Sequence, residues 1–203
     1  GSLNLKADYD LYSNLTTLPK KFTVTSPYML AKVLADEHYG DREQLVLGLA
    51  DVLKAQLAGI DAEVVQVDEA NVTGHPDDGP LAAAGINRVL EGAQGEKAVH
   101  LCYGNYGGQT IQAGTWEALL AFLNALRTDH VVLELAHRPS EDLEALAQVD
   151  DRIALGIVDD LDALAFEPFD DDPGGIGVVL GERSPQRRHH DFRPQPPEAL
   201  RQF

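Results

Sequence analysis

The chain has 203 residues, of which 44% are hydrophobic and 24% are charged, a balance typical of a folded domain with a sizeable core. Its net charge of −17, from 16 basic and 33 acidic residues, argues against nucleic acid or an anionic membrane as a partner, because both require a basic surface. No apolar run approaches the roughly 20 residues that span a membrane, and a single cysteine excludes an internal disulfide, so we expect a cytoplasmic protein.

Short apolar runs alternate with amphipathic stretches between residues 21 and 167. The apolar runs predict strands over residues 21–27, 62–69, 97–104, 130–137 and 152–159. The amphipathic stretches predict helices over residues 41–60, 80–92, 115–129 and 140–149, with Asp41, Thr115 and Ser140 as N-caps and Pro80 in a first turn. This alternation predicts an α/β fold with a parallel sheet and right-handed crossovers.

A TIM-barrel-like (β/α) fold is our leading interpretation, and an open doubly wound sheet is the alternative. No Gly-x-Gly-x-x-Gly follows a first strand, so nothing indicates a dinucleotide site. About five strands are evident where a TIM barrel has eight, which suggests an incomplete barrel. We divide the chain into an N-terminal extension (1–20), a barrel-like domain (21–167) and an irregular or disordered tail (168–203), in which charge blocks mix with proline and glycine.

Polar side chains recur at the carboxyl ends of three consecutive strands. Because side chains alternate between the faces of a strand, Asp68, His100, Cys102 and Glu134 lie on the faces opposite their apolar neighbours. If the apolar sets pack under helices, these four groups point into a barrel lumen, at the end where such folds place their sites. Imidazole, thiolate and carboxylate are regular zinc ligands, so His100, Cys102 and Glu134 predict a zinc site with one open position.

The open position could take a substrate thiol, whose pKa falls on coordination, while Asp68 could bind a substrate ammonium group. Three structural alternatives stay open: Cys102 as a small buried hydrophobe, His100 as a core histidine, and Glu134 as half of an interior ion pair. Tyr106, in the glycine-rich loop after Cys102, is a candidate stacking surface for a substrate.

These segments carry a family resemblance. Residues 22–71, followed by "VHLCYGN" and "VVLELAH", resemble the cobalamin-independent methionine synthase family, most closely its short single-barrel members, which are similar to the C-terminal catalytic domain. The resemblance implies a TIM barrel with a catalytic zinc, which transfers a methyl group to the thiol of homocysteine. It implies His100 and Cys102 as the family's His-x-Cys zinc pair, and Glu134 as its glutamate ligand.

The strand end Gln66-Val67-Asp68-Glu69 is similar to a family motif whose aspartate contacts the homocysteine amino group. The resemblance thereby implies Asp68 and Glu69 as catalytic residues and Gln66 and Asp68 as substrate-binding residues. The implied partners are homocysteine and a methyl donor, either a folate or a corrinoid.

The chain departs from the family pattern at several places. Ala70 stands where the family has proline, no second cysteine supplies the fourth zinc ligand, and the pattern lacks the first strands and breaks off after "LGIVDD". His189 or His190 could replace the missing ligand, although "RRHH" is more typical of solvated charge. The alternatives are therefore a truncated or impaired member that serves as a metal-binding or assembly module, or a related zinc-dependent thiol alkyltransferase. A homo-oligomer would cover an open edge of the barrel.

Overall fold

The computed structural model describes residues 3–106, 109–135 and 138–156. Within these residues, five parallel strands form one sheet in the order β1-β2-β3-β6-β7, and β4 and β5 form a separate antiparallel hairpin. The strands are β1 (Lys21–Thr25), β2 (Val64–Glu69), β3 (Glu96–Leu101), β4 (Asn105–Tyr106), β5 (Gln109–Thr110), β6 (His130–Glu134) and β7 (Arg152–Gly156). All five predicted parallel strands are thus confirmed, within a few residues of their expected bounds.

Helices precede β1 and connect the strands. The α-helices are α1 (Leu5–Ser13), α2 (Pro27–Val33), α3 (Arg42–Leu57), α4 (Gly79–Leu90), α5 (Leu120–Leu123) and α6 (Glu141–Leu146), and the 3-10 helices are η1 (Val72–Gly74), η2 (Pro76–Asp78) and η3 (Glu117–Leu119). No helix in the described ranges is long and apolar enough to cross a membrane.

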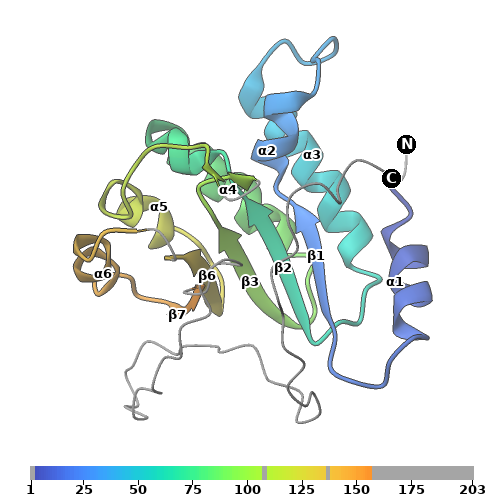
Figure 1. Cartoon of the computed structure of the whole chain (residues 1–203). Helices are drawn as coiled ribbons and strands as arrows, with labels where there is room; N and C mark the ends of the chain where they lie inside the picture. The colour runs from blue at the N-terminus through green and yellow to red at the C-terminus, as the bar shows by residue number, and fades with distance from the viewer. Residues whose placement is uncertain (1–2, 107–108, 136–137, 157–203) are drawn as a thin grey trace, which may run out of the picture.

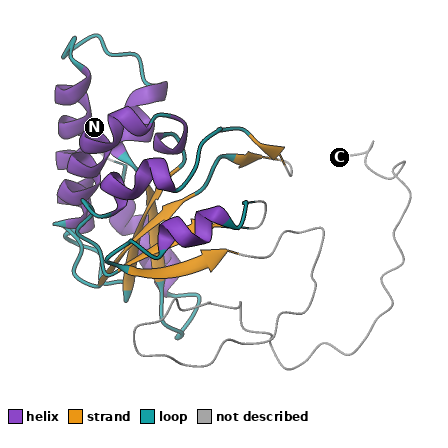
Figure 2. Cartoon of the chain, turned by 90° about the vertical axis from the view of Figure 1, so that its left-hand side faces the viewer, coloured by secondary structure: helices purple, strands orange, loops and turns teal. Residues whose placement is uncertain are grey.

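The strand order distinguishes the barrel-type arrangement from the doubly wound one. Every strand of the main sheet lies beside the strand that precedes it in the parallel series, so the sheet always advances in one direction. Right-handed crossovers then place their helices on one face, whereas a doubly wound sheet reverses direction and carries helices on both faces. Figures 1 and 2 show α2, α3 and α4 grouped on one side of the sheet. The described residues therefore form five consecutive strands of a barrel-type α/β fold.

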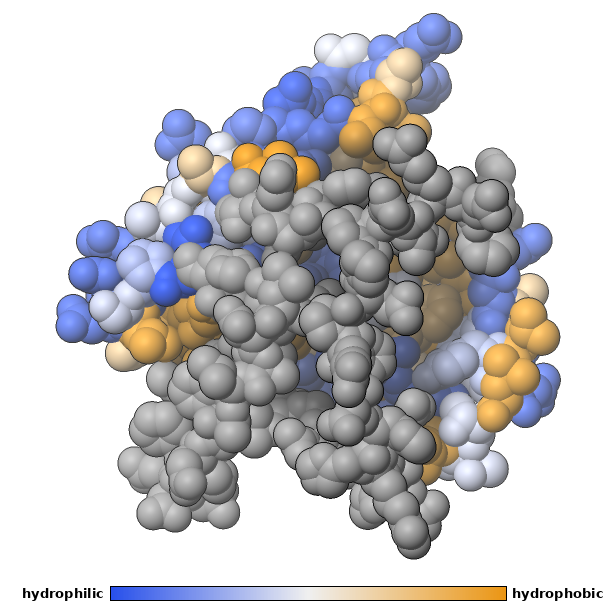
Figure 3. Space-filling model, viewed as in Figure 1, coloured by the Kyte–Doolittle hydropathy of each residue, from blue (hydrophilic) through white to orange (hydrophobic). Residues whose placement is uncertain are grey.

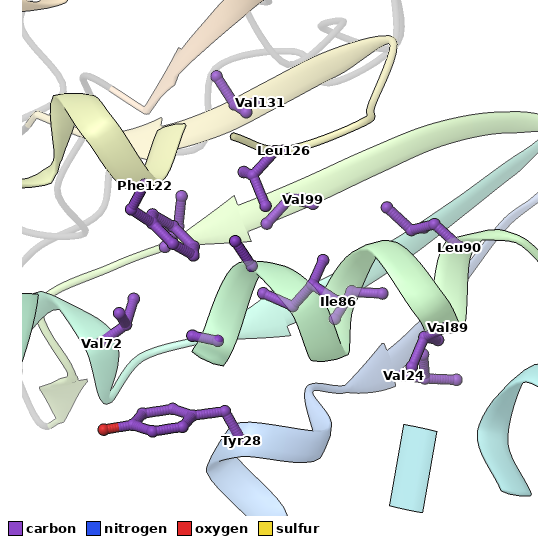
Figure 4. Packing of buried hydrophobic residues seen from close by; sticks show 14 of the residues in the cluster. Val24, Tyr28, Val72, Ile86, Val89, Leu90, Val99, Phe122, Leu126 and Val131 are labelled. Carbon is purple, nitrogen blue, oxygen red and sulfur yellow. The ribbon is translucent and has the colours of Figure 1, made fainter. Parts of the chain in front are cut away.

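The hydrophobic core lies between this helix layer and the sheet. Figure 4 shows Val99 and Val131 of the sheet in one buried cluster with Ile86 of α4. Alternate strand residues face the helices and are fully buried, among them Val65, Val67, Val99, Leu101, Val131 and Leu133. The opposite face of the sheet carries the polar residues that are described below.

The sequence predicts some of the residues that cap the helix N-termini. The Asp41 side chain accepts the N–H of Gln44 at 2.8 Å and so begins α3, and Pro80 lies in the first turn of α4. Ser140 directly precedes α6, but its backbone is helical and its side chain makes no cap hydrogen bond. The predicted N-cap at Asp41 is confirmed, and the predicted capping hydrogen bond at Ser140 is absent.

Two helices of the N-terminal part were not predicted. Within the expected extension, α1 buries Tyr9, whose ring meets Phe22 of β1 edge-on at 5.7 Å and whose hydroxyl donates to the carbonyl of Asp61. Pro27 was expected only to end a strand, yet it begins α2, because the Ser26 side chain caps that helix. Residues 5–13 therefore pack onto the domain.

The helix that was predicted over residues 115–129 is much shorter. The region holds only η3 and α5, and Thr115 accepts the Ala118 N–H at 3.4 Å. Beyond Leu123, side-chain amides replace the helical pairing: Asn87 accepts the N–H of Arg127 at 2.7 Å, and Asn124 donates to a carbonyl of the following segment at 3.1 Å. Tertiary hydrogen bonds thus override the helical periodicity. The expected tail, residues 168–203, lies outside the described residues, and so does the end of the last predicted strand.

The visible described surface is mainly hydrophilic, with separate apolar areas (Figure 3). Several exposed hydrophobic residues belong to the N-terminal segment, among them Leu11, Leu15 and Leu18. Hydrophilic residues dominate as the acidic composition of the chain predicts.

Candidate functional site

The parallel register brings the predicted polar residues to one end of the sheet. Asp68 of β2 pairs with His100 of β3, and His100 pairs with Val132 of β6. Glu134 lies two residues beyond Val132 and therefore on the same face of the sheet. Cys102 follows directly after the end of β3. The carboxyl ends of three neighbouring strands thus bring these side chains to the same edge of the sheet.

Burial alternates from Val99 onward, as the sequence predicts, although Ala98, on the same face as His100, is also fully buried. Val99 and Leu101 have no exposed surface, whereas His100 between them is partly exposed. The alternation continues past the strand, since Cys102 is partly exposed and Tyr103 is fully buried. His100 and Cys102 therefore share the face opposite the helices, and β6 shows the same alternation up to Glu134.

Asp68 is held in place by its neighbour on the same face. Gln66 donates to Asp68 Oδ1 at 2.7 Å and accepts from Lys21 Nζ at 2.9 Å. Both ends of the Gln66 amide are thus used within the protein, and its side chain is 8% exposed. This arrangement favours Gln66 as the residue that orients Asp68, while Asp68 itself stays partly exposed.

Glu69 lies on the face opposite Asp68 and is 1% exposed. Its Oε1 accepts the N–H groups of Asn71 at 2.6 Å and Val72 at 2.9 Å, and its Oε2 accepts the hydroxyl of Ser26. Burial raises the pKa of Glu69, and these hydrogen bonds oppose the rise. The carboxylate joins the end of β1 to the turn after β2. This placement favours a positioning role over direct contact with a substrate.

Only one of the two carboxylate oxygens of Glu134 has a hydrogen-bond partner among the described residues. Its Oε2 accepts the backbone N–H of Tyr103 at 3.1 Å. Its Oε1 is buried and has no hydrogen-bond partner among the described residues. A buried carboxylate oxygen without a partner is costly, so this atom marks a place where a cation would be stabilised.

The backbone of Cys102 is fixed from the other side. The buried Thr73 hydroxyl lies 3.0 Å from the carbonyl oxygen of Cys102 and 3.1 Å from that of Ala70. The turn after β2 thereby sets where the chain leaves β3. Cys102 is the only cysteine in the sequence.

The donor set suits zinc by its chemistry. His100, Cys102 and Glu134 offer nitrogen, sulfur and oxygen ligands from one face and one end of the sheet, and Glu134 Oε1 has no partner within the part of the chain that the structure describes. Across residues 3–106, 109–135 and 138–156, however, no three His, Cys, Asp or Glu side chains are grouped closely enough to hold a metal ion. The residues fit the metal in kind and orientation, and binding would require their side chains to move closer together.

The expected loop after Cys102 contains the short hairpin of β4 and β5, and the backbone of Tyr106 lies in β4. The Tyr103 carbonyl accepts the N–H groups of Ile111 and Gln112, so the chain returns to the strand end after the hairpin. His189 and His190 lie outside the described residues.

Sequence reasoning missed a buried ion pair beside the end of β6. Arg138 Nε lies 2.8 Å from Asp142 Oδ2, and the two side chains are 9% and 3% exposed. Arg138 lies before α6 and outside any helix, so the helical spacing rule gave no signal for this pair.

Comparisons with known proteins point to one group. The chain is 29% identical over 150 residues to a methionine synthase of Pyrococcus furiosus and 30% identical over 150 residues to that of Pyrococcus abyssi. Each match covers 72% of this chain and 41% of the relative, so the chain spans about two fifths of the length of these curated relatives. No protein-family model matches the chain.

A solved structure shares the fold. It is a B12-independent methionine synthase from Shewanella sp. W3-18-1 in complex with selenomethionine, with a TM-score of 0.64 and 24% identity. The match covers 77% of this chain and 49% of that one. The chain is thus similar in sequence to methionine synthases and in fold to a B12-independent methionine synthase.

Proposed function

We propose that the chain carries the zinc-binding part of a methyltransferase that transfers a methyl group to the thiol of homocysteine. Its likeness to the methionine synthases supports the reaction class and implies homocysteine and a separate methyl donor as substrates. The observation that carries the proposal is the shared face and strand end of His100, Cys102 and Glu134, together with the unpartnered Oε1 of Glu134.

These three residues would hold zinc. Zinc, when bound, lowers the pKa of a coordinated thiol and so supplies a thiolate nucleophile at neutral pH. Cys102 would bind as a thiolate, and a reducing compartment such as the cytoplasm would protect it from oxidation.

The remaining residues bind and orient the substrate. Asp68 would accept a hydrogen bond from the homocysteine ammonium group, because Asp68 pairs with His100 across the sheet and Gln66 holds its carboxylate. Glu69 would act by fixing the strand ends rather than by touching the substrate. Tyr106 remains our candidate for a substrate contact from the hairpin.

The zinc content of the purified chain tests the proposal. We expect near-stoichiometric zinc in the wild-type protein under reducing conditions, and its loss in Cys102→Ser and His100→Ala. His38→Ala is the matched control, because His38 is exposed and far along the chain from the strand ends. Wild-type protein without zinc would refute the metal site. If zinc is present, assays with methylfolate and methylcobalamin donors test methyl transfer to homocysteine.

A second candidate function is a metal-free assembly module, and one observation favours it. The described side chains include no group of three ready to hold a metal, and the sheet has only five barrel-type strands in these residues. Its edges at β1 and β7 would then pair with a second copy or another chain. Zinc-free protein that forms a defined oligomer in sedimentation equilibrium supports this alternative.

A further inference from the structure

Arg138 is a charged residue in an almost completely buried setting. Its side chain is 9% exposed, it pairs with Asp142 at 2.8 Å, and it also donates to the carbonyl of Gly114. Asp142 in turn accepts the backbone N–H of Trp116 at 3.0 Å. Burying two charges is favourable only when hydrogen bonds satisfy them, and here several do.

The guanidinium of Arg138 covers the ring of Tyr103, with 3.8 Å between its central carbon and the ring centroid. Trp116 meets the same ring edge-on, with 4.9 Å between the ring centroids. Burial raises the pKa of Tyr103; Arg138 opposes this rise, and the charges of Asp142 and Glu134 add to it. Tyr103 is therefore enclosed between a cation and an aromatic ring, within the field of Glu134.

Tyr103 links this cluster to the candidate site through its backbone. Its N–H donates to Glu134 Oε2 at 3.1 Å, while its carbonyl accepts two N–H groups from the returning loop. One oxygen of Glu134 is thus occupied, and Oε1 is left buried and without a partner in the described chain. The ring that Arg138 covers and the N–H that Glu134 accepts therefore belong to the same residue.

We propose that Arg138 is a positioning residue for Glu134: it clamps Tyr103, so that the Tyr103 N–H holds one carboxylate oxygen and presents the other to a bound cation. The identity of that cation as zinc rests on the proposed function. Outer partners of this kind commonly change metal affinity by roughly 10- to 100-fold when they are altered.

The residue type matters for this role. The planar guanidinium can stack on a ring and pair with Asp142 at the same time, whereas a lysine ammonium is a compact point charge. Arg138→Lys therefore keeps the charge next to Asp142 and removes the clamp. Arg88→Lys is the matched control, because Arg88 pairs with Asp51 on the exposed helix surface.

The first experiment needs no metal. Hydrogen exchange of the Tyr103 amide, followed by NMR on the metal-free protein, reports its bond to Glu134. We expect roughly tenfold faster exchange in Arg138→Lys and in Asp142→Asn, and no change in Arg88→Lys. A folded Arg138→Lys protein with an unchanged Tyr103 amide would overturn the proposal. Asp142→Asn gives a second reading if Arg138→Lys folds poorly.

The second experiment separates positioning from general stability. Cobalt(II) binding, followed by its ligand-field spectrum, should weaken about tenfold in Arg138→Lys, with altered bands. In a Glu134→Gln background the same change should have no further effect, because it acts through Glu134. An equal loss in both backgrounds contradicts the proposal. If wild-type protein binds neither zinc nor cobalt, the proposed function fails, and the amide measurement still decides the role of Arg138.

Discussion

Two carboxylates at strand ends of the same sheet, Glu69 of β2 and Glu134 of β6, lie in different environments. Glu69 faces the helix layer, and the surrounding chain satisfies both its oxygens. Glu134 faces the opposite side, and only one of its oxygens is bonded within the described residues. The same residue type therefore closes a turn in one place and, in the other, leaves one oxygen without a partner among the described residues.

The buried Glu69 should leave a signature in the pH dependence of stability. Burial raises its pKa in the folded protein above the ordinary value of 4.5, so the folded state holds this proton more tightly than the unfolded state. Its contribution is complete below pH 4.5 and is lost as the pH rises through the folded-state pKa. Urea unfolding between pH 4.5 and 7 should therefore show a flatter decline for Glu69→Gln than for wild type.

The control for this experiment is a carboxylate whose pKa shifts in the opposite direction. Glu91 is an exposed carboxylate, and its hydrogen bond with Lys54 lowers its pKa. Glu91→Gln should not flatten the decline. An unchanged pH dependence in Glu69→Gln would show that Glu69 does not hold a raised pKa.

At the scale of elements, the helices that cover the sheet pack closely where a small residue lies between them. A Cβ added at Gly85 of α4 would lie 2.8 Å from Val46 Cγ1 of α3 and 3.0 Å from Pro27 Cγ of α2. Both distances are tighter than ordinary van der Waals contact, so glycine sets how closely α4 approaches its two neighbours. This packing holds the helix layer against the strands that carry the site.

Gly85→Ala should therefore destabilise the fold, although alanine is the better helix former. We expect the free energy of unfolding to fall by about 1–3 kcal/mol, the usual penalty of overpacking. Ala84→Gln, at the neighbouring exposed position, should stay within about 0.5 kcal/mol of wild type. Denaturant titration measures the free energy of unfolding of both variants. A Gly85→Ala protein more stable than wild type would show that the helices can move apart to accommodate the added methyl group.

The elements also show what sequence reasoning can and cannot predict. The strand period placed His100, Cys102 and Glu134 on one face correctly, because alternation depends only on local geometry. The same rule places Glu69 with the buried valines of β2, so its position was derivable. The contact between Arg138 and the Tyr103 ring could not be derived from the sequence, because Tyr103 and Trp116 meet only through tertiary packing.

Tertiary contacts also account for the elements that were predicted incorrectly. Pro27 stops β1 and starts α2, and only the capping bond of Ser26 distinguishes these two readings of a proline. The helix after Thr115 shortens where Asn87 and Asn124 bond distant backbone groups. These side chains carry no local signal for such partners.

At the scale of the whole molecule, the described residues form five consecutive strands of a barrel-type sheet, and the chain matches about two fifths of its curated relatives. The face that would line a barrel lumen carries the proposed site. The central claim is that His100, Cys102 and Glu134 bind zinc with a position open to a substrate thiol.

X-ray absorption at the zinc edge tests this claim most directly. The zinc-loaded chain should show one sulfur ligand at about 2.3 Å among nitrogen and oxygen ligands at about 2.0–2.2 Å. Adding homocysteine should introduce a second sulfur at the same distance. A shell without sulfur, or one that homocysteine leaves unchanged, would contradict the account.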